Sequence, residues 1–93
     1  MYSEHMRKRY VDRLIDEFDG IKDWHKIIKC ETDEKRLSSF ITYITEEKKH
    51  YDAMKEALSF HEDDAAMYFV CYMDNKIDEI MESVTAIKSG KRS

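Results

Sequence analysis

The feature that most restricts the fold of this chain is its shortage of turn-forming residues. Proline does not occur among the 93 residues, and glycine occurs only at Gly20 and Gly90. A β-sandwich or an α/β fold of this length needs several tight turns, and such turns depend on proline and glycine. Hydrophobic residues make up 42% of the chain, including many aromatic residues, which is too many for a disordered protein. The sequence therefore predicts a single all-α domain over residues 1–93.

The charge balance and the cysteines exclude several classes of protein. The formal net charge is −4, and the short basic clusters at 6–9 and 88–92 are typical of solvated helix ends, so we expect no nucleic-acid partner. No apolar run approaches the length of a membrane span, and the N-terminus lacks the apolar core of a signal peptide. Cys30 and Cys71 show no metal-binding spacing and are expected to be reduced thiols, which favours a cytoplasmic location.

Hydrophobic periodicity predicts three helices, over about residues 3–29, 33–58 and 62–88. In each range, apolar residues recur every three or four positions, as one face of a helix requires. The apolar positions of the three helices are, in order, Val11, Leu14, Ile15, Phe18, Ile21, Trp24 and Ile28; Leu37, Phe40, Ile41, Ile44, Tyr51, Met54 and Leu58; and Val70, Met73, Ile77, Ile80, Val84 and Ile87.

Polar residues indicate where the second and third helices begin. Thr32 is the predicted N-cap of the second helix, and Ser59 with Glu62 has the form of a capping box for the third. Gly20 lies inside the first helix at a cost of about 1 kcal/mol relative to alanine, either as a surface glycine or at a close helix contact. Short turns between amphipathic helices predict a compact bundle or a hairpin that assembles with others. A chain this short buries only roughly 60% of its unfolded surface, so pairing with a second copy would help it.

Two polar residues interrupt the apolar seam of the second helix. The seam is apolar up to Ile44 and resumes at Tyr51, but Glu47 and His50 lie between them at positions that should face inward. These two residues are three apart and therefore project from one helix face. A buried carboxylate is costly unless it is paired, hydrogen-bonded or bound to a metal, so a partner for Glu47 is expected.

An antiparallel hairpin supplies such a partner. If the first two helices turn near Thr32, Glu17 lies at the height of Glu47, and two carboxylates converge with the imidazole of His50. Carboxylate oxygens and an imidazole nitrogen suit iron or manganese, and also zinc. An E-x-x-H pattern also arises by chance in a chain rich in acids, and the adjacent Lys48 would fit a solvated face. A metal site and a solvated face both remain open.

The stretch 46–54, Glu-Glu-Lys-Lys-His-Tyr-Asp-Ala-Met, resembles the E-E-K-E-H-A-A-M segment of the encapsulated ferritins, short members of the ferritin-like superfamily. In that family a metal-binding glutamate on the first helix precedes the glutamate of E-x-x-H by the same interval as Glu17 precedes Glu47. The acidic run at 16–19 and the pair at 32–33 also resemble the family's pattern. The similarity covers about residues 7–73.

The resemblance implies a helical hairpin plus a third helix, two copies of which would assemble as a homodimer into a four-helix-type bundle with a di-iron site. Glu17, Glu47 and His50 would be the iron ligands, and the activity would be ferroxidase oxidation of Fe(II) to Fe(III). Another divalent metal would suit the same donors.

The resemblance also places residues around the ligands. Asp16 and Asp19 match acidic positions that flank the metal's entry route, and Trp24 replaces a tyrosine that supports the ligands. A tail that targets such proteins into an encapsulin shell is not recognisable in residues 87–93. The alternative is a small all-α interaction module without catalytic activity, such as a phage-type inhibitor, regulator or adaptor, whose partner would be another protein.

Overall fold

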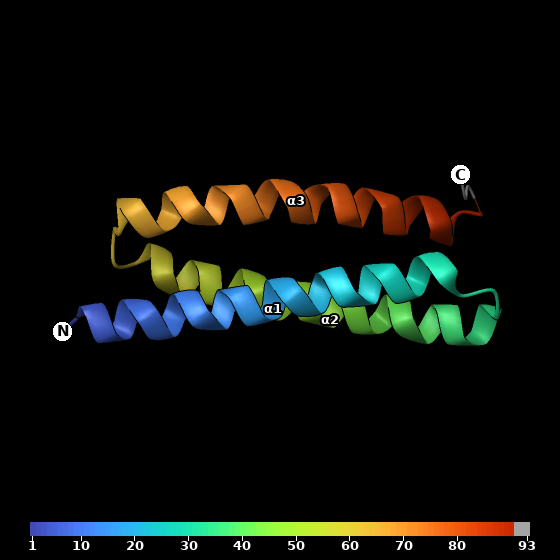
Figure 1. Ribbon diagram of the computed structural model, residues 1–93, viewed down its shortest axis with the longest axis horizontal. Helices are drawn as coiled ribbons and strands as arrows, with labels where there is room; N and C mark the ends of the chain where they lie inside the picture. Colours follow the sequence, from blue (N-terminus) through green and yellow to red (C-terminus); the bar gives the residue numbers. More distant parts are fainter. Residues whose placement is uncertain (91–93) are drawn as a thin grey trace.

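The computed structural model describes residues 1–90, which form three helices in an antiparallel up-down-up arrangement (Figure 1). Helix α1 spans Glu4–Cys30, α2 spans Glu34–Ser59 and α3 spans Asp64–Lys88. No strand occurs within the described range, so the prediction of an all-α chain is confirmed. Residues 91–93 lie outside the described residues, and with them part of the basic cluster at 88–92 and of the segment examined for a targeting tail.

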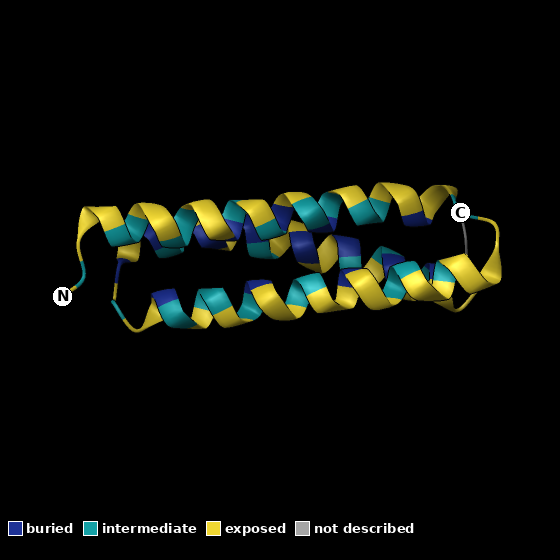
Figure 2. Cartoon of the chain, turned by 90° about the horizontal axis from the view of Figure 1, so that it is seen from below, coloured by how far each residue is buried: buried dark blue, intermediate teal, exposed yellow. Residues whose placement is uncertain are grey.

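The three helices lie side by side in a rod measuring 48 × 18 × 16 Å. Helix α1 packs most extensively against α2, and α3 lies along the groove between them. Buried residues lie on the sides that the helices turn toward one another (Figure 2). The outer side of the α1–α2 pair is therefore left uncovered by α3. None of the helices within residues 1–90 is long and apolar enough to cross a membrane.

The core follows the predicted periodicity most closely on α3, whose six predicted apolar positions are all buried. On α2 the buried residues are spaced seven apart, at Ile44, Tyr51 and Leu58. A spacing of seven residues is close to two helical turns, so these side chains form one straight row. The other predicted apolar residues of α2, such as Phe40 and Met54, pack at the edge of the core. The burial of this row determines where the polar residues between Ile44 and Tyr51 point.

The N-cap of helix α2 lies one residue later than predicted. The N-cap is Asp33, whose carboxylate accepts a hydrogen bond from the backbone N–H of Arg36 at 2.9 Å, so the prediction of Thr32 is wrong. An aspartate at this position brings a full negative charge to the positive end of the helix, which a threonine hydroxyl does not.

The capping box predicted for the third helix is also wrong. Ser59 is the last residue of α2 and donates its hydroxyl to the carbonyl of Glu56 at 2.6 Å. Glu62 adopts a left-handed backbone conformation, with φ of 51°. The N-cap of α3 is Asp63, which accepts from the N–H of Ala66 at 3.2 Å.

Asp63 also connects the start of α3 to the start of α1. Arg7 donates from Nε and Nη2 to the two carboxylate oxygens of Asp63, and the Tyr2 hydroxyl donates to one of them. These bonds favour the ionised carboxylate, so the pKa of Asp63 lies well below its usual range. The start of α1 is thereby fastened to the start of α3.

Candidate metal centre

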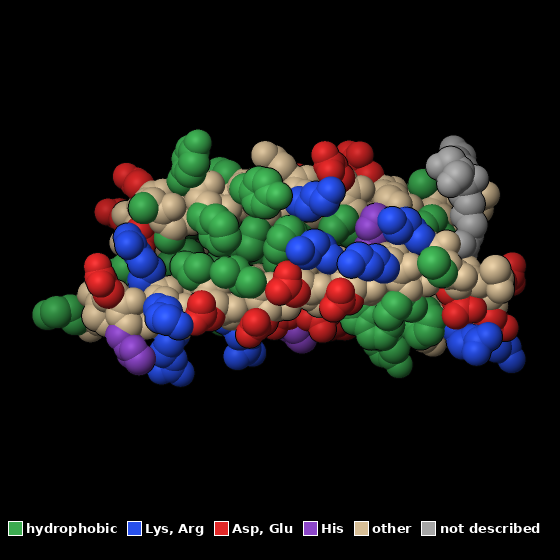
Figure 3. Space-filling model, viewed as in Figure 1, with side chains coloured by type: hydrophobic (Ala, Val, Ile, Leu, Met, Phe, Trp, Pro, Cys, Tyr) green, Lys and Arg blue, Asp and Glu red, His purple; other side chains and the backbone are tan. Residues whose placement is uncertain are grey.

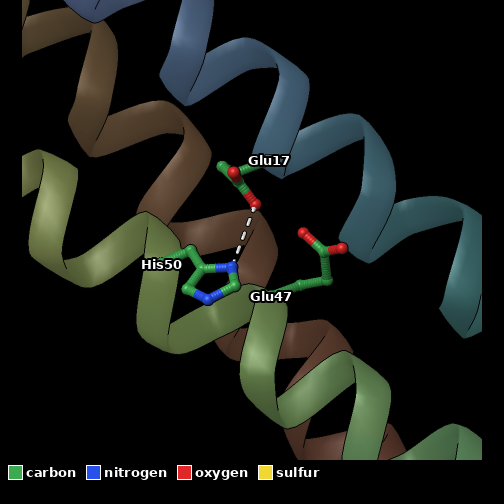
Figure 4. Close-up of side chains that lie close together, drawn as sticks. All are labelled: Glu17, Glu47 and His50. Carbon is green, nitrogen blue, oxygen red and sulfur yellow. Dashed lines mark ion pairs between the residues drawn. The ribbon is translucent and has the colours of Figure 1, made fainter.

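Glu17, Glu47 and His50 come together on the outer side of the α1–α2 pair. Glu17 extends from α1, and Glu47 and His50 extend from α2 toward it (Figure 4). One ligand atom from each residue lies within 4.8 Å of the others. The structure therefore groups the three residues that the sequence analysis selected as ligands.

The group lies in a surface groove and not in the buried seam that the sequence analysis expected. The side chain of His50 is 64% exposed, whereas that of Glu17 is 13% exposed, and Glu47 is half-buried. The cause is the row of core positions at Ile44, Tyr51 and Leu58, which turns the residues at 47 and 50 toward the outer groove. The open side of the group faces away from α3.

The two carboxyl groups are close enough to share a proton. A hydrogen bond with the Glu17 carboxyl raises the pKa of Glu47 above its ordinary value, and burial adds to the effect. Two nitrogen groups lie beside Glu17. The Nδ1 atom of His50 lies 3.9 Å from Oε2 of Glu17, and the Nε atom of the Arg13 guanidinium lies 3.5 Å from Oε1 of Glu17. Two adjacent carboxylates need a positive charge between them, which either a proton or a metal ion supplies.

The Glu47 carboxylate lies against the backbone of α1 at Gly20. A β carbon at Gly20 would lie 3.4 Å from Oε2 and 3.5 Å from Cδ of Glu47. These are ordinary van der Waals distances, so a β carbon would fit beside the carboxylate. The backbone of α1 and the carboxylate of α2 are in contact here, but the contact does not require glycine.

The donor set fits a transition-metal ion. Two oxygens and one nitrogen are donors typical of iron, manganese and zinc. Bond lengths in such sites are about 2.0–2.2 Å, so two donors on one ion lie at most roughly 4.4 Å apart. The separations here are no more than 4.8 Å, so small side-chain rotations would bring the atoms to bonding distance. One chain supplies three donor residues, and the remaining coordination positions would point outward.

The other predicted site residues lie outside this group. Asp16 and Asp19 are exposed, and Asp19 pairs with Lys22 at 3.3 Å. The Trp24 ring packs against Phe40 and Tyr43, with ring centroids 5.4 and 5.2 Å away. Trp24 follows Glu17 by seven residues, which is about 10 Å along a helix. It therefore belongs to an aromatic group further along the groove.

A cavity of about 320 Å³ lies in the opposite direction along the same groove. Its lining residues are Met6, Arg9, Tyr10, Arg13 and Met54. Arg13 is shared between the cavity wall and the ion pair with Glu17. Arg13 was not among the predicted site residues, although its position four residues before Glu17 is the spacing of a helical ion pair.

Comparison of the chain with protein-family models, with curated proteins and with solved structures found no match. The function of the cluster is therefore inferred from its donors, its geometry and its surroundings.

Proposed function

We propose that this protein is a ferritin-like iron-binding protein whose site is shared between two copies of the chain, and that it oxidises Fe(II) to Fe(III). The observation that carries the proposal is the convergence of Glu17, Glu47 and His50 within 4.8 Å. The resemblance of residues 46–54 to the encapsulated ferritins supports the choice of iron among the metals that suit these donors.

A second copy is needed because one chain cannot surround two metal ions. It offers two carboxylates and one imidazole, and the imidazole is largely exposed on the open side of the group. A second copy placed against the same groove would add its own three donors to the same space. Four carboxylates and two imidazoles are a sufficient donor set for two ions.

An aromatic group and a cavity lie on either side of the ligands, in positions suited to a two-fold symmetric dimer. The aromatic group, formed by Trp24, Phe40 and Tyr43, lies beyond the ligands toward the α1–α2 turn. The cavity beside Tyr10 and Met54 lies on the other side. Both are centred roughly seven residues from Glu17, or about 10 Å along the helix.

A two-fold axis through the ligands and perpendicular to the helices would set each aromatic group over the partner's cavity. The chemistry of the two surfaces is compatible, since thioether and guanidinium groups both favour contact with aromatic rings. Two contacts of this kind would flank the joined metal site.

Iron is the substrate in this proposal, and the chain supplies the environment for its oxidation. Carboxylates stabilise Fe(III) more than Fe(II) because their negative charge is matched by the higher charge of the product. Loss of the shared proton from Glu17 and Glu47 prepares both oxygens for the metal. The redox chemistry itself belongs to iron and the oxidant, dioxygen or peroxide.

The test is anaerobic Fe(II) titration followed by admission of air, with the protein mass followed by sedimentation. The expected result is about one iron per chain, a larger mass with iron than with chelator, and growth of ferric absorbance. Glu47→Ala should abolish all three, whereas Glu46→Ala, which removes the adjacent exposed carboxylate, should retain them. A wild-type protein that binds no iron in this titration would contradict the proposal.

A non-catalytic interaction module is the second candidate function. It is favoured by large aromatic side chains that remain exposed on α3, at Tyr68 and Tyr72. These residues lie away from the candidate metal centre, so both functions are compatible with one chain.

A further inference from the structure

The first half of α3 exposes an aromatic patch, defined here as Tyr68, Phe69 and Tyr72. Their exposed fractions are 84%, 42% and 68%. Hydrophobic side chains gather over this half of α3 and the neighbouring part of α1 (Figure 3). Exposed tyrosines at positions four apart share one helix face, and aromatic residues of this kind are enriched at protein interfaces. Core packing needs neither tyrosine, because Val70 and Met73 fill it.

A basic patch adjoins the aromatic one along the α1–α3 groove and is defined as Lys22, Lys29 and Lys76. The Nζ atom of Lys22 lies 4.7 Å from the ring centroid of Phe18. Lys29 follows His25 by about one turn of α1, and Lys76 lies on α3. Burial first, and then the charges of these two lysines, lower the pKa of His25. Figure 3 shows lysine and arginine side chains gathered next to the hydrophobic ones on this face.

The imidazole of His25 marks where the two helices meet. Its Nε2 lies 2.9 Å from Oγ of Ser83 on α3, so the basic patch bridges α1 and α3. The acidic neighbours are held loosely: Asp19 lies 3.3 Å from Lys22, and Glu79 lies 3.7 Å from Lys76. Exposed pairs of this type contribute little and exchange partners readily. A carboxylate from another molecule can therefore compete for Lys22 and Lys76.

We propose that the α1–α3 face binds an acidic amphipathic helix of another protein. Its apolar side chains would cover the aromatic patch and its carboxylates would meet the basic patch. Tyr72 and Lys76 are four residues apart, so the two patches adjoin within about one helical turn, and a helix of about five turns spans both. The aromatic side chains would act as anchors, and the lysines would fix the direction of the bound helix.

A protein partner fits this face better than a nucleic acid. The basic residues of this face form one local patch in a chain of net charge −4, and the aromatic end lies next to the exposed Asp64 at the start of α3. A phosphate backbone running along the face would meet that carboxylate. The proposal is also independent of the candidate metal centre, which lies on the outer side of the α1–α2 pair.

The probe is a designed helical peptide with leucines on one face of its first two turns and glutamates over its last two. Its dissociation constant is measured by calorimetry on the full chain in chelator. Tyr72→Ala should weaken binding about tenfold or more, and Lys76→Glu should weaken it several-fold and reduce its salt dependence. The matched controls are Ile27→Ala and Lys35→Glu, which alter exposed residues outside this face.

Three results would overturn the proposal. The first is no binding of the peptide at about 1 mM, where even a weak interface is detected. The second is equal binding of a peptide in which lysines replace the glutamates. The third is binding of single-stranded oligothymidylate, lost in Tyr72→Ala and Lys76→Glu, which would assign the face to nucleic acid. All of these variants alter exposed side chains, and circular dichroism confirms that each keeps the helical fold.

Discussion

The carboxylate of Glu47 lies against the backbone of α1 at Gly20, where a β carbon would be 3.4 Å from Oε2. This spacing is an ordinary van der Waals contact, so alanine fits without displacing the carboxylate. The added methyl group would nevertheless cover one side of it. Gly20 thus keeps the carboxylate accessible at the expense of helix stability, and the two effects are separable by experiment.

Gly20→Ala should stabilise the protein in chelator by up to about 1 kcal/mol, because alanine has the higher helix propensity. Such a gain corresponds to a rise in melting temperature of about 4–8 °C. The same variant should bind Fe(II) several-fold more weakly, since the methyl group hinders the carboxylate. Thermal melts and iron titration measure the two effects. Unchanged iron affinity alongside higher stability would show that the methyl group does not hinder the carboxylate.

Glu47→Gln tests the proton shared by the two carboxyl groups. Because the fold raises the pKa of Glu47, the folded state holds a proton that the unfolded state releases near its ordinary value of about 4.3. This contribution to stability is present at low pH and is lost as the pH rises through the raised pKa. Glu47→Gln should therefore stabilise the metal-free protein at pH 7, by less than about 1 kcal/mol at this partly exposed site.

Thermal melts between pH 4 and 8 measure the difference, with Glu46→Gln as the control. The advantage of Glu47→Gln should vanish at the acidic end of this range and reverse when iron is present. A glutamine variant that is less stable than the wild type at pH 7 without metal would contradict the shared-proton interpretation.

The sequence contained enough to predict the helices but not the orientation of all their polar residues. Every apolar position predicted for α3 is buried, since a regular three-four spacing admits only one inward face. On α2, rows through Ile44 and Tyr51 or through Phe40 and Met54 are both apolar. Packing against α3 selects the first, which moves His50 to the surface.

Contacts distant in sequence account for the remaining differences. The bonds of Asp63 to Tyr2 and Arg7 join residues more than 50 positions apart, and no local pattern indicates them. They also explain why Asp63 rather than Ser59 caps α3, because the carboxylate satisfies two partners besides the helix end. The position of Glu17 opposite Glu47 was predictable because an antiparallel hairpin fixes which residues of its two helices lie at the same level. The contact of Gly20, in contrast, depends on the conformation of a single side chain, that of Glu47.

Asp63→Asn tests the junction between α1 and α3. Arg7 first, and then Tyr2, hold the pKa of Asp63 well below its usual range. The ionised carboxylate therefore contributes stability that is fully present above its unfolded pKa of about 3.9 and is lost as the pH falls below it. Asp63→Asn should lower the melting temperature at pH 7, and the difference from wild type should shrink in acid.

Asp64→Asn, at an exposed position next to Asp63, is the matched control and should show no such pH dependence. Urea unfolding at pH 7 and near pH 2 provides the comparison. Equal losses at both pH values would assign the effect to the helix cap alone.

Tyr51→Phe tests the link between α2 and α3. The buried hydroxyl of Tyr51 donates to Oδ1 of Asp74 at 2.9 Å, and Lys55 approaches the same carboxylate at 3.2 Å. Removing the hydroxyl should cost about 1–2 kcal/mol, because a hydrogen bond to a charged acceptor is lost while Lys55 still pairs with Asp74. Urea unfolding measures the loss, and a neutral substitution would mean that water replaces the hydroxyl.

Cysteine cross-linking tests the two-fold arrangement proposed for the metal site. In that arrangement α2 of one copy lies antiparallel to α2 of the other, with Tyr43 of the aromatic group over the partner's cavity at Met54. Cys30 and Cys71 are free and exposed, so both are first replaced by serine. Tyr43→Cys and Met54→Cys are then prepared separately and mixed under mild oxidation with iron present.

Mixed dimers linking positions 43 and 54 should form faster than dimers of either variant with itself, because a disulfide requires Cα atoms within about 7 Å. The preference should weaken in chelator, since metal shared between copies favours the dimer by linkage. A pair of cysteines at Ser39 and Glu56, both exposed on α2, controls for random collision. Rapid linkage of position 43 to itself would place the symmetry axis at the aromatic group, and the two sets of ligands would then be too far apart to share a metal ion.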